Sequence, residues 1–319
     1  MKLKRVLTLT TSLLILLSLI SGCSTVSGND DSDGKVKVVT TIFPQYDFVR
    51  EIAGDSVSLT MLLPPGSESH SFEPNPQDMI KIQNCDISIY VGGRSDSWAE
   101  KILESVDTSG ITLITLMNLV EIRTEEIVEG MEDDHDPEHE HDEQEYDEHV
   151  WTSPENTKLI VQKISDALCE ADTENAELFR RNTEEYIGKL DTLDAAFHDV
   201  INNSARKTLV FGDRFPFRYF ADAYGLNYFA AFPGCASDTE ASAATIGFLI
   251  DKVKKEKIPV VFHIEFSNQK MVNTISEETG AKVMLFHSCH NVSRDDIAKG
   301  ANYLDLMAQN VEALKEALK

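Results

Sequence analysis

The chain has 319 residues, of which 42% are hydrophobic and 8% aromatic, and its formal net charge at pH 7 is -25. This length and composition exclude a largely disordered polypeptide and leave room for two domains with a substantial core. The excess of Asp and Glu argues against nucleic acid as a partner, because contacts to phosphates require Lys and Arg. It favours a protein that attracts cations.

The N-terminus has the pattern of a secretory signal. Basic residues at positions 2, 4 and 5 precede the apolar run Val6 to Ile20, and Ser21, Gly22 and Cys23 follow. The segment "LISGC" resembles the bacterial lipobox, which implies a signal peptide over residues 1–22 and a lipid attached to Cys23. A plain signal peptide with an incidental cysteine is the alternative. Residues 23–35 are polar and contain glycine, so we expect a flexible tether to the cell membrane.

Short β-branched runs then alternate with helical segments, which predicts an α/β fold with parallel sheets. The expected strands lie in "VKVVTTI", "VSLTMLL", "DISIYVG" and "ITLITL", and after residue 205 in "KTLVFG", "NYFA", "IPVVFH" and "AKVMLF". Helices are expected at 46–54 and 97–105, and later at 239–256, 270–279 and 295–318. We therefore predict two (β/α) lobes, at 36–172 and 204–319.

Two helices are expected between the lobes. Ser153 and Pro154 form an N-cap followed by proline at the first helical position, and the next apolar residues have helical spacing. If residues 173–203 are one helix, it is about 46 Å long. A stiff linker of that length permits only small rocking motions of the lobes. The cleft between the lobes is then the expected ligand site, since open α/β sheets bind at the carboxyl ends of their strands.

Histidines fall where such a site would need them. His70 follows the second expected strand in a proline-rich loop, His149 precedes Val150 and Trp151 at a helix entrance, and His287 follows the last expected strand. Imidazoles held in this way are typical metal ligands, although each His taken singly is also compatible with a structural or surface role.

Several motifs together resemble the zinc- and manganese-binding solute-binding lipoproteins of bacterial ABC transporters. They are "TTIFPQYDFVREIAGD", "LLPPGSESHSFEP", "DEHVWTSPENT", "YFADAYGL" and "ISEETGAKV", which occur in the family's order. The resemblance implies two lobes joined by a long rigid helix and a metal site in the interlobe cleft. It also implies delivery of that metal to a membrane permease, and we expect a monomer that is not an enzyme.

Transferred by position, the family's first two ligands fall on His70 and His149. The third falls on Arg214, which cannot ligate because its guanidinium stays protonated, so Asp213 is the nearest substitute. His287 replaces the usual acidic fourth ligand. The predicted metal ligands are thus His70, His149, His287 and Asp213, with Glu265, His290 or water as alternatives in the fourth place.

Three imidazoles favour Zn2+ over Mn2+, which prefers more oxygen donors, so zinc is the predicted cargo and manganese the alternative. A surface adhesin with a structural metal and a zinc hydrolase are further alternatives, although no HExxH or GxSxG motif occurs. Residues 132–148 hold eleven acidic residues and three histidines, from which we expect a solvated loop that collects cations. Cys235 and Cys289 are candidates for a disulfide.

Overall fold

The computed structural model describes residues 34–67, 72–94, 96–131, 145–236 and 241–319. By its internal contacts the chain divides into Met1–Lys35 and Val36–Lys319. All helices and strands within the described residues belong to the second of these units. His70 and residues 132–144 of the expected acidic loop lie outside the described residues.

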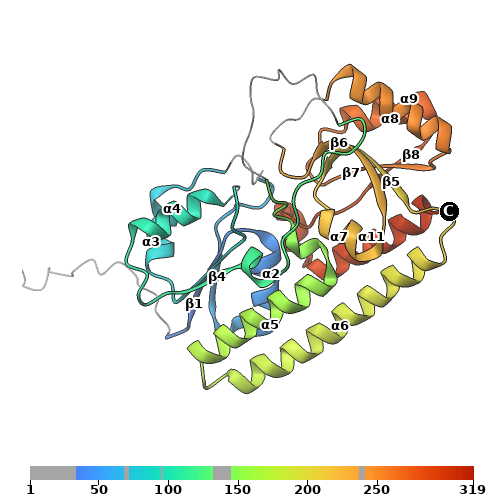
Figure 1. Cartoon of the computed structure of the whole chain (residues 1–319). Helices are drawn as coiled ribbons and strands as arrows, with labels where there is room; N and C mark the ends of the chain where they lie inside the picture. Colours follow the sequence, from blue (N-terminus) through green and yellow to red (C-terminus); the bar gives the residue numbers. More distant parts are fainter. Residues whose placement is uncertain (1–33, 68–71, 95, 132–144, 237–240) are drawn as a thin grey trace, which may run out of the picture. The chain divides into compact units, whose positions relative to one another are not determined.

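Two parallel four-stranded sheets form the centre of this unit (Figure 1). The first has the order β2-β1-β3-β4, and the second has the order β6-β5-β7-β8. Their strands are β1 (Lys37–Thr40), β2 (Ser58–Met61), β3 (Ile87–Tyr90), β4 (Thr112–Thr115), β5 (Thr208–Phe215), β6 (Asn227–Pro233), β7 (Val260–His263) and β8 (Lys282–Leu285). All strand pairs are parallel, which confirms the predicted α/β class with two lobes.

Helices follow most strands. They are α2 (Phe43–Ala53), α3 (Pro76–Gln83), α4 (Ser97–Ser105), α5 (Pro154–Ala171), α6 (Ala176–Asn202), α7 (Arg218–Tyr224), α8 (Ala243–Glu256), α9 (Lys270–Thr279), α10 (Arg294–Ala298) and α11 (Tyr303–Ala317), with single 3-10 turns η1 (Gly54–Ser56), η2 (Leu116–Leu119) and η3 (Val150–Thr152). The sequence did not predict α3 or α7, both of which are short. The single helix expected at 295–318 is wrong, because the chain turns at Gly300, whose φ is +82°, and α11 starts anew after its cap Asn302.

Helix α5 begins at the residue that the sequence predicts, but the expected capping hydrogen bond is absent. Ser153 is the N-cap residue and Pro154 the first helical residue, yet the Ser153 side chain makes no capping hydrogen bond. In the first turn, the Thr157 hydroxyl donates to the carbonyl oxygens of Trp151 and Ser153. The apolar stripe of α5 is buried and packs on α2 and α6.

Helix α6 connects the two sheets. Its 27 residues extend about 40 Å, and it packs against α2 near the first sheet and against α7 and α11 near the second (Figure 1). Tyr186, Leu190 and Phe197 lie on its buried face. The same hydrophobic core contains Val38 of β1 and Phe262 of β7, so the lobes share one apolar interior.

Hydrogen bonds also tie the lobes together beside α6. The buried carboxylate of Asp47 in α2 accepts a 2.7 Å bond from the backbone N–H of Tyr303, the first residue of α11. Arg50 donates to the carbonyl oxygen of Ala301 at 2.9 Å. The Tyr303 hydroxyl donates to the carbonyl oxygen of Trp151 at 2.7 Å. These bonds hold the end of the chain against elements of the first half.

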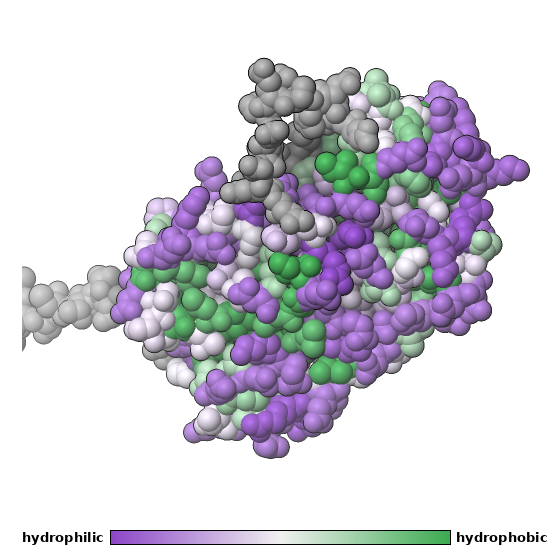
Figure 2. All heavy atoms as spheres, viewed as in Figure 1, coloured by the Kyte–Doolittle hydropathy of each residue, from purple (hydrophilic) through white to green (hydrophobic). Residues whose placement is uncertain are grey.

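Most of the face viewed in Figure 1 is hydrophilic, with hydrophobic patches between the polar regions (Figure 2). Large hydrophobic side chains that remain exposed include Ile80, Ile127 and Leu159, which come from separate segments of the chain. Single exposed apolar side chains are usual in folded proteins. Within the described ranges, no helix combines the length and apolar character needed to cross a bilayer.

Candidate metal site

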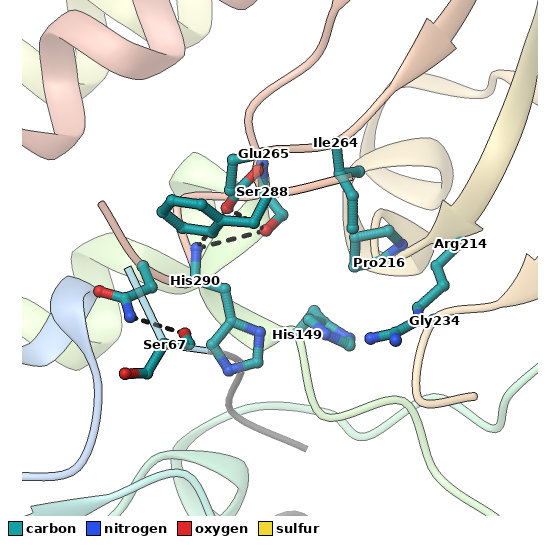
Figure 3. A pocket seen from close by; sticks show the side chains of 11 residues that line it. Ser67, His149, Arg214, Pro216, Gly234, Ile264, Glu265, Ser288 and His290 are labelled. Atoms are coloured by element: carbon teal, nitrogen blue, oxygen red, sulfur yellow. Dashed lines mark hydrogen bonds between the residues drawn. The ribbon is translucent and has the colours of Figure 1, made fainter. Parts of the chain in front are cut away.

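A small pocket lies at the carboxyl ends of the second sheet (Figure 3). The end of β5 and the loops after β6, β7 and β8 line it, and Ser67 and His149 border it from the first half of the chain. Its volume is about 30 Å³, which suffices for about two water-sized species. Open parallel sheets bind ligands at this end, so the pocket lies where the topology predicts a site.

His149 is held in the pocket by its neighbours in sequence. Its side chain is 1% exposed, and Val150 and Trp151 after it are fully buried. The indole N–H of Trp151 donates to the carbonyl oxygen of Ser288 at 2.8 Å, which joins this segment to the loop after β8. His149 is thus placed by a rigid turn packed between both lobes.

Asp147 orients the His149 ring. Its Oδ1 lies 3.2 Å from Nδ1 and accepts a 2.8 Å bond from the backbone N–H of His149. Burial alone lowers the pKa of His149, but the charge and hydrogen bond of Asp147, together with the charges of Glu148 and Glu125, outweigh it, so the pKa is raised. A histidine that bonds a carboxylate through Nδ1 presents Nε2 to a metal.

The segment that carries Asp147 is itself anchored on α7. Asp147 accepts a 2.8 Å bond at its carbonyl oxygen from the Tyr219 hydroxyl, which in turn accepts from the backbone N–H of Arg123. Gly234 after β6 permits the close approach, since a Cβ there would lie 3.0 Å from a carboxylate oxygen of Asp147. The described residues on both sides of the acidic loop are therefore fixed to the second lobe.

His290 is the imidazole that meets His149. Their ring centroids are 5.3 Å apart at 82°, and the Trp151 ring lies 5.0 Å from His290 (Figure 3). Cys289, just before His290, has a left-handed φ of +59°, which is uncommon for a residue other than glycine. The two rings come from segments 141 positions apart in numbering, yet they share one wall of the pocket.

Glu265 fixes the loop that carries His290. Its carboxylate accepts bonds from the Ser288 N–H at 2.8 Å, the Ser288 hydroxyl at 2.6 Å and the His290 N–H at 3.0 Å. Three donors thus occupy its two oxygens. Glu265 lines the pocket, but the bonds shown make it a residue that positions His290.

Of the ligands predicted from sequence, the structure places His149 in the pocket and two others elsewhere. His287 does not line it. The backbone of His287 is bonded to the Asn310 side chain, and His287 lines a neighbouring pocket of about 530 Å³ that shares Ile264, Glu265, Phe266 and Asn291 with the first. Asp213 does not line the pocket either. Its oxygens accept the backbone N–H groups of Arg214 and Ile264, at 2.9 and 3.3 Å.

The pairing of β5 with β6 is irregular between Phe211 and Arg214, and of the two neighbouring residues Arg214 lines the pocket whereas Asp213 does not. After β8, His290 follows the left-handed residue Cys289 and lines the pocket, whereas His287 precedes Cys289 and does not line it. His290 and Glu265 were considered from sequence only as possible fourth ligands. The role of Asp147 was missed, although its position two residues before His149 was a visible signal.

The loop that carries His70 begins beside His290. The Asn291 amide donates 2.9 Å bonds to the carbonyl oxygens of Pro64 and Ser67, and Gly66 donates to the carbonyl oxygen of Val292. The last described residue before His70 thus lies at the pocket. Among the described residues, no group of three or more His, Cys, Asp or Glu side chains is arranged to hold a metal ion.

The structure does not contain the disulfide considered between Cys235 and Cys289. Cys85, Cys169, Cys235 and Cys289 are all free thiols. Burial raises the pKa of Cys235 and of Cys289 well above the usual value for a thiol. Neither is therefore suited to act as a thiolate at neutral pH.

Comparison with known proteins identifies the family of the chain. A family model described as "Zinc-uptake complex component A periplasmic" matches residues 38–317. The zinc-binding lipoprotein AdcA of Streptococcus pneumoniae is 33% identical over 291 residues, which are 91% of this chain and 57% of AdcA. The high-affinity zinc uptake system protein ZnuA of Bacillus subtilis is 31% identical over 307 residues, 95% of this chain and 94% of that protein.

Among solved structures, the Zn(II)-bound ZnuA-like domain of Streptococcus pneumoniae AdcA has a TM-score of 0.74 at 30% identity, covering 89% of this chain and 99% of that one. This chain spans little more than half the length of complete AdcA. The match over nearly all of residues 38–317 places the chain in the family of periplasmic A components of zinc-uptake complexes.

Proposed function

We propose that this protein captures Zn2+ outside the cytoplasm and delivers it to an ABC-type permease for import. The observation that carries the proposal is the pair His149 and His290, which meet at the carboxyl ends of the second sheet with Asp147 behind the first ring. Two imidazole nitrogens, one with a carboxylate behind it, are a typical zinc donor set. Relatives named for zinc binding and zinc uptake support the choice of metal.

We propose His70 as the third ligand. Ser67, the last described residue before it, lines the pocket and is bonded through its carbonyl oxygen to Asn291 beside His290. The sequence-predicted ligands His287 and Asp213 do not line this pocket, so the proposed set is His70, His149 and His290. No catalytic role is assigned to these residues, because the family is that of a transport component.

The lipobox-like segment before Cys23 supports a lipid anchor in the cell membrane. The proposed monomer would receive zinc at the surface and release it to the permease. The linking helix α6 and the bonds between α2 and α11 suit a binding protein that moves little between its loaded and empty states.

The test is calorimetric titration of the purified metal-free protein with Zn2+ and Mn2+. We expect one tight zinc site and weaker manganese binding. His149→Ala and His290→Ala should each lower zinc affinity by more than roughly 100-fold, since each removes a direct ligand. His287→Ala is the matched control and should bind zinc as the unaltered protein does. Tighter binding of manganese, or loss of zinc binding in His287→Ala alone, would overturn the proposal.

A further inference from the structure

The larger pocket, which adjoins the proposed zinc site, is lined by groups that zinc binding does not use. Its volume is about 530 Å³, within the range of about 300–1,000 Å³ that is usual for small-molecule sites. The loops after β7 and β8 and residues between Val292 and Gln309 form its walls. We infer that this pocket binds an aromatic α-amino acid in its zwitterionic form. The groups that would recognise this ligand lie outside the proposed set of zinc ligands.

Lys299 offers the pocket a partner for a carboxylate. It lines the pocket and is exposed, and within the described residues its ammonium group takes part in no ion pair. Lys252 and Lys315, by contrast, are each paired with a glutamate. A charge-assisted hydrogen bond from an ammonium group to a carboxylate is stronger than a bond between neutral groups. Lys299 is therefore available to the carboxylate of a ligand.

Two carboxylates on the same pocket offer partners for an ammonium group. Asp296 lies in α10 and Asp305 in the first turn of α11, and both line the pocket. Among the described residues, each side chain accepts through one oxygen, Asp296 from the Ser293 hydroxyl at 2.5 Å and Asp305 from the Asn302 amide at 2.7 Å. The second oxygen of each carboxylate can accept an N–H of a ligand. One cation and two anions on one pocket favour a ligand that carries both charges.

Two imidazoles add polar atoms to these walls. Nδ1 of His263 lies 2.9 Å from the carbonyl oxygen of Ile264. Because a carbonyl oxygen only accepts, Nδ1 carries the hydrogen, and Nε2 of the neutral ring is an acceptor. Nδ1 of His287 is buried and has no hydrogen-bond partner within the described residues, so a ligand can reach this ring only at Nε2. His263 thus provides a further acceptor for the three N–H donors of an ammonium group.

Phe266 provides the surface for an aromatic ring. It lines the pocket, is 49% exposed and has a φ of +60°, an uncommon conformation for a bulky residue. Gln269 in the same loop has a φ of +58°. Strained backbone of this kind is concentrated at ligand-binding segments. Ile264 and Leu306 add apolar groups to the pocket, and a ring packed against Phe266 would remove an exposed aromatic surface from water.

The test is calorimetric titration of the metal-free protein with L-phenylalanine and three analogues, each of which lacks one of the recognised groups. The amine 2-phenylethylamine lacks the carboxylate, 3-phenylpropionate lacks the ammonium group, and L-alanine lacks the ring. L-phenylalanine should bind at least roughly tenfold more tightly than each analogue, since each loses one set of contacts.

Substitutions connect each contact to its residue. Lys299→Met should weaken binding of L-phenylalanine at least roughly tenfold and leave that of 2-phenylethylamine unchanged, because the amine has no carboxylate to lose. Lys255→Met, at an exposed position of α8 outside the pocket, is the matched control and should bind L-phenylalanine as the unaltered protein does. Phe266→Asn removes the ring but keeps a residue that tolerates the left-handed conformation, and it should also weaken binding roughly tenfold.

Asp296→Asn and Asp305→Asn, combined in one protein, test the contact with the ammonium group. The amide oxygens can still accept the bonds from Ser293 and Asn302, so the turns before α10 and α11 should persist. The combined variant should bind L-phenylalanine at least roughly tenfold more weakly and 3-phenylpropionate no more weakly than the unaltered protein.

Several results would overturn this site. The metal-free protein would show no binding of L-phenylalanine, or one of the three analogues would bind equally well. Equal affinity for L-phenylalanine in Lys299→Met and in Lys255→Met would place any bound amino acid elsewhere on the protein. These titrations contain no metal, so such results would leave the proposed capture of zinc intact.

Discussion

The carboxylate of Asp147 binds both the ring Nδ1 and the backbone N–H of His149, at 3.2 and 2.8 Å. One buried side chain thus fixes the rotation of the imidazole and the path of the chain that carries it. Partners of this kind raise the basicity of a metal-ligating histidine and select the nitrogen that faces the metal.

Replacing Asp147 by Asn should weaken zinc binding by roughly 10- to 100-fold, because the neutral amide keeps an acceptor but loses the charge that supports the imidazole. The measurement is calorimetric titration. Glu145→Gln is the control, since Glu145 lies in the same segment with 53% of its side chain exposed. Equal zinc affinity in the two variants would contradict the role assigned to Asp147.

Trp151→Phe should lower the free energy of unfolding by about 1–3 kcal/mol. The substitution removes the indole donor to Ser288 and leaves a buried carbonyl oxygen without that bond. Urea denaturation of the metal-free protein measures the loss. Trp98→Phe is a matched control, because Trp98 is only partly buried. The prediction is wrong if both variants lose the same stability.

Two buried carboxyl groups predict how stability varies with pH. Burial raises the pKa of Asp96 to about 7, and hydrogen bonds from Val91 and Thr41 lower it only in part. Burial likewise raises the pKa of Asp47 to about 6, against the opposing charge of Arg50. In both groups the folded state keeps a proton that the unfolded state releases near pH 4.

Each group therefore contributes stability that is fully present below about pH 4 and is lost as the pH rises through 6 for Asp47 and 7 for Asp96. Denaturation of the metal-free protein should show a smaller decrease in stability from pH 5 to pH 8 in Asp96→Asn than in the unaltered chain. The difference should be on the order of a few kcal/mol. Asp251→Asn, at an exposed position of α8, should keep the original profile. The same profile in both variants would refute this account.

The acidic loop leads to a prediction of how many zinc ions the protein binds. The described residues on its two sides pair with each other, through the bridge of Thr124 with Tyr146 and the bond from Glu125 N–H to the carbonyl oxygen of Glu145. Replacing residues 132–144 by a short Gly-Ser linker should therefore leave His149 in place. We expect the tight zinc site to persist and weaker zinc binding to disappear in calorimetry. Loss of the tight site would mean that the loop supplies a ligand.

Local sequence was sufficient for most of the architecture. All eight strands found in the described residues were predicted, because β-branched runs bounded by turn residues favour strands through local sequence alone. The helix expected at 295–318 was wrong, because one apolar periodicity continued across the turn at Gly300. His149 could be selected as a pocket residue since Val150 and Trp151 beside it signal burial.

The sequence by itself determined the α/β class, the two lobes, the linking helix and the position of His149 near the cleft. Only the tertiary structure decided that His290 meets His149 while His287 lines the adjoining larger pocket. That choice depends on the left-handed turn at Cys289 and on bonds from Ser288 and His290 to Glu265, more than twenty residues away. The tertiary structure also decided that Arg214 lines the pocket and Asp213 does not. Adjacent residues carry the same local signal, and only packing determines which of their two opposite directions faces the ligand.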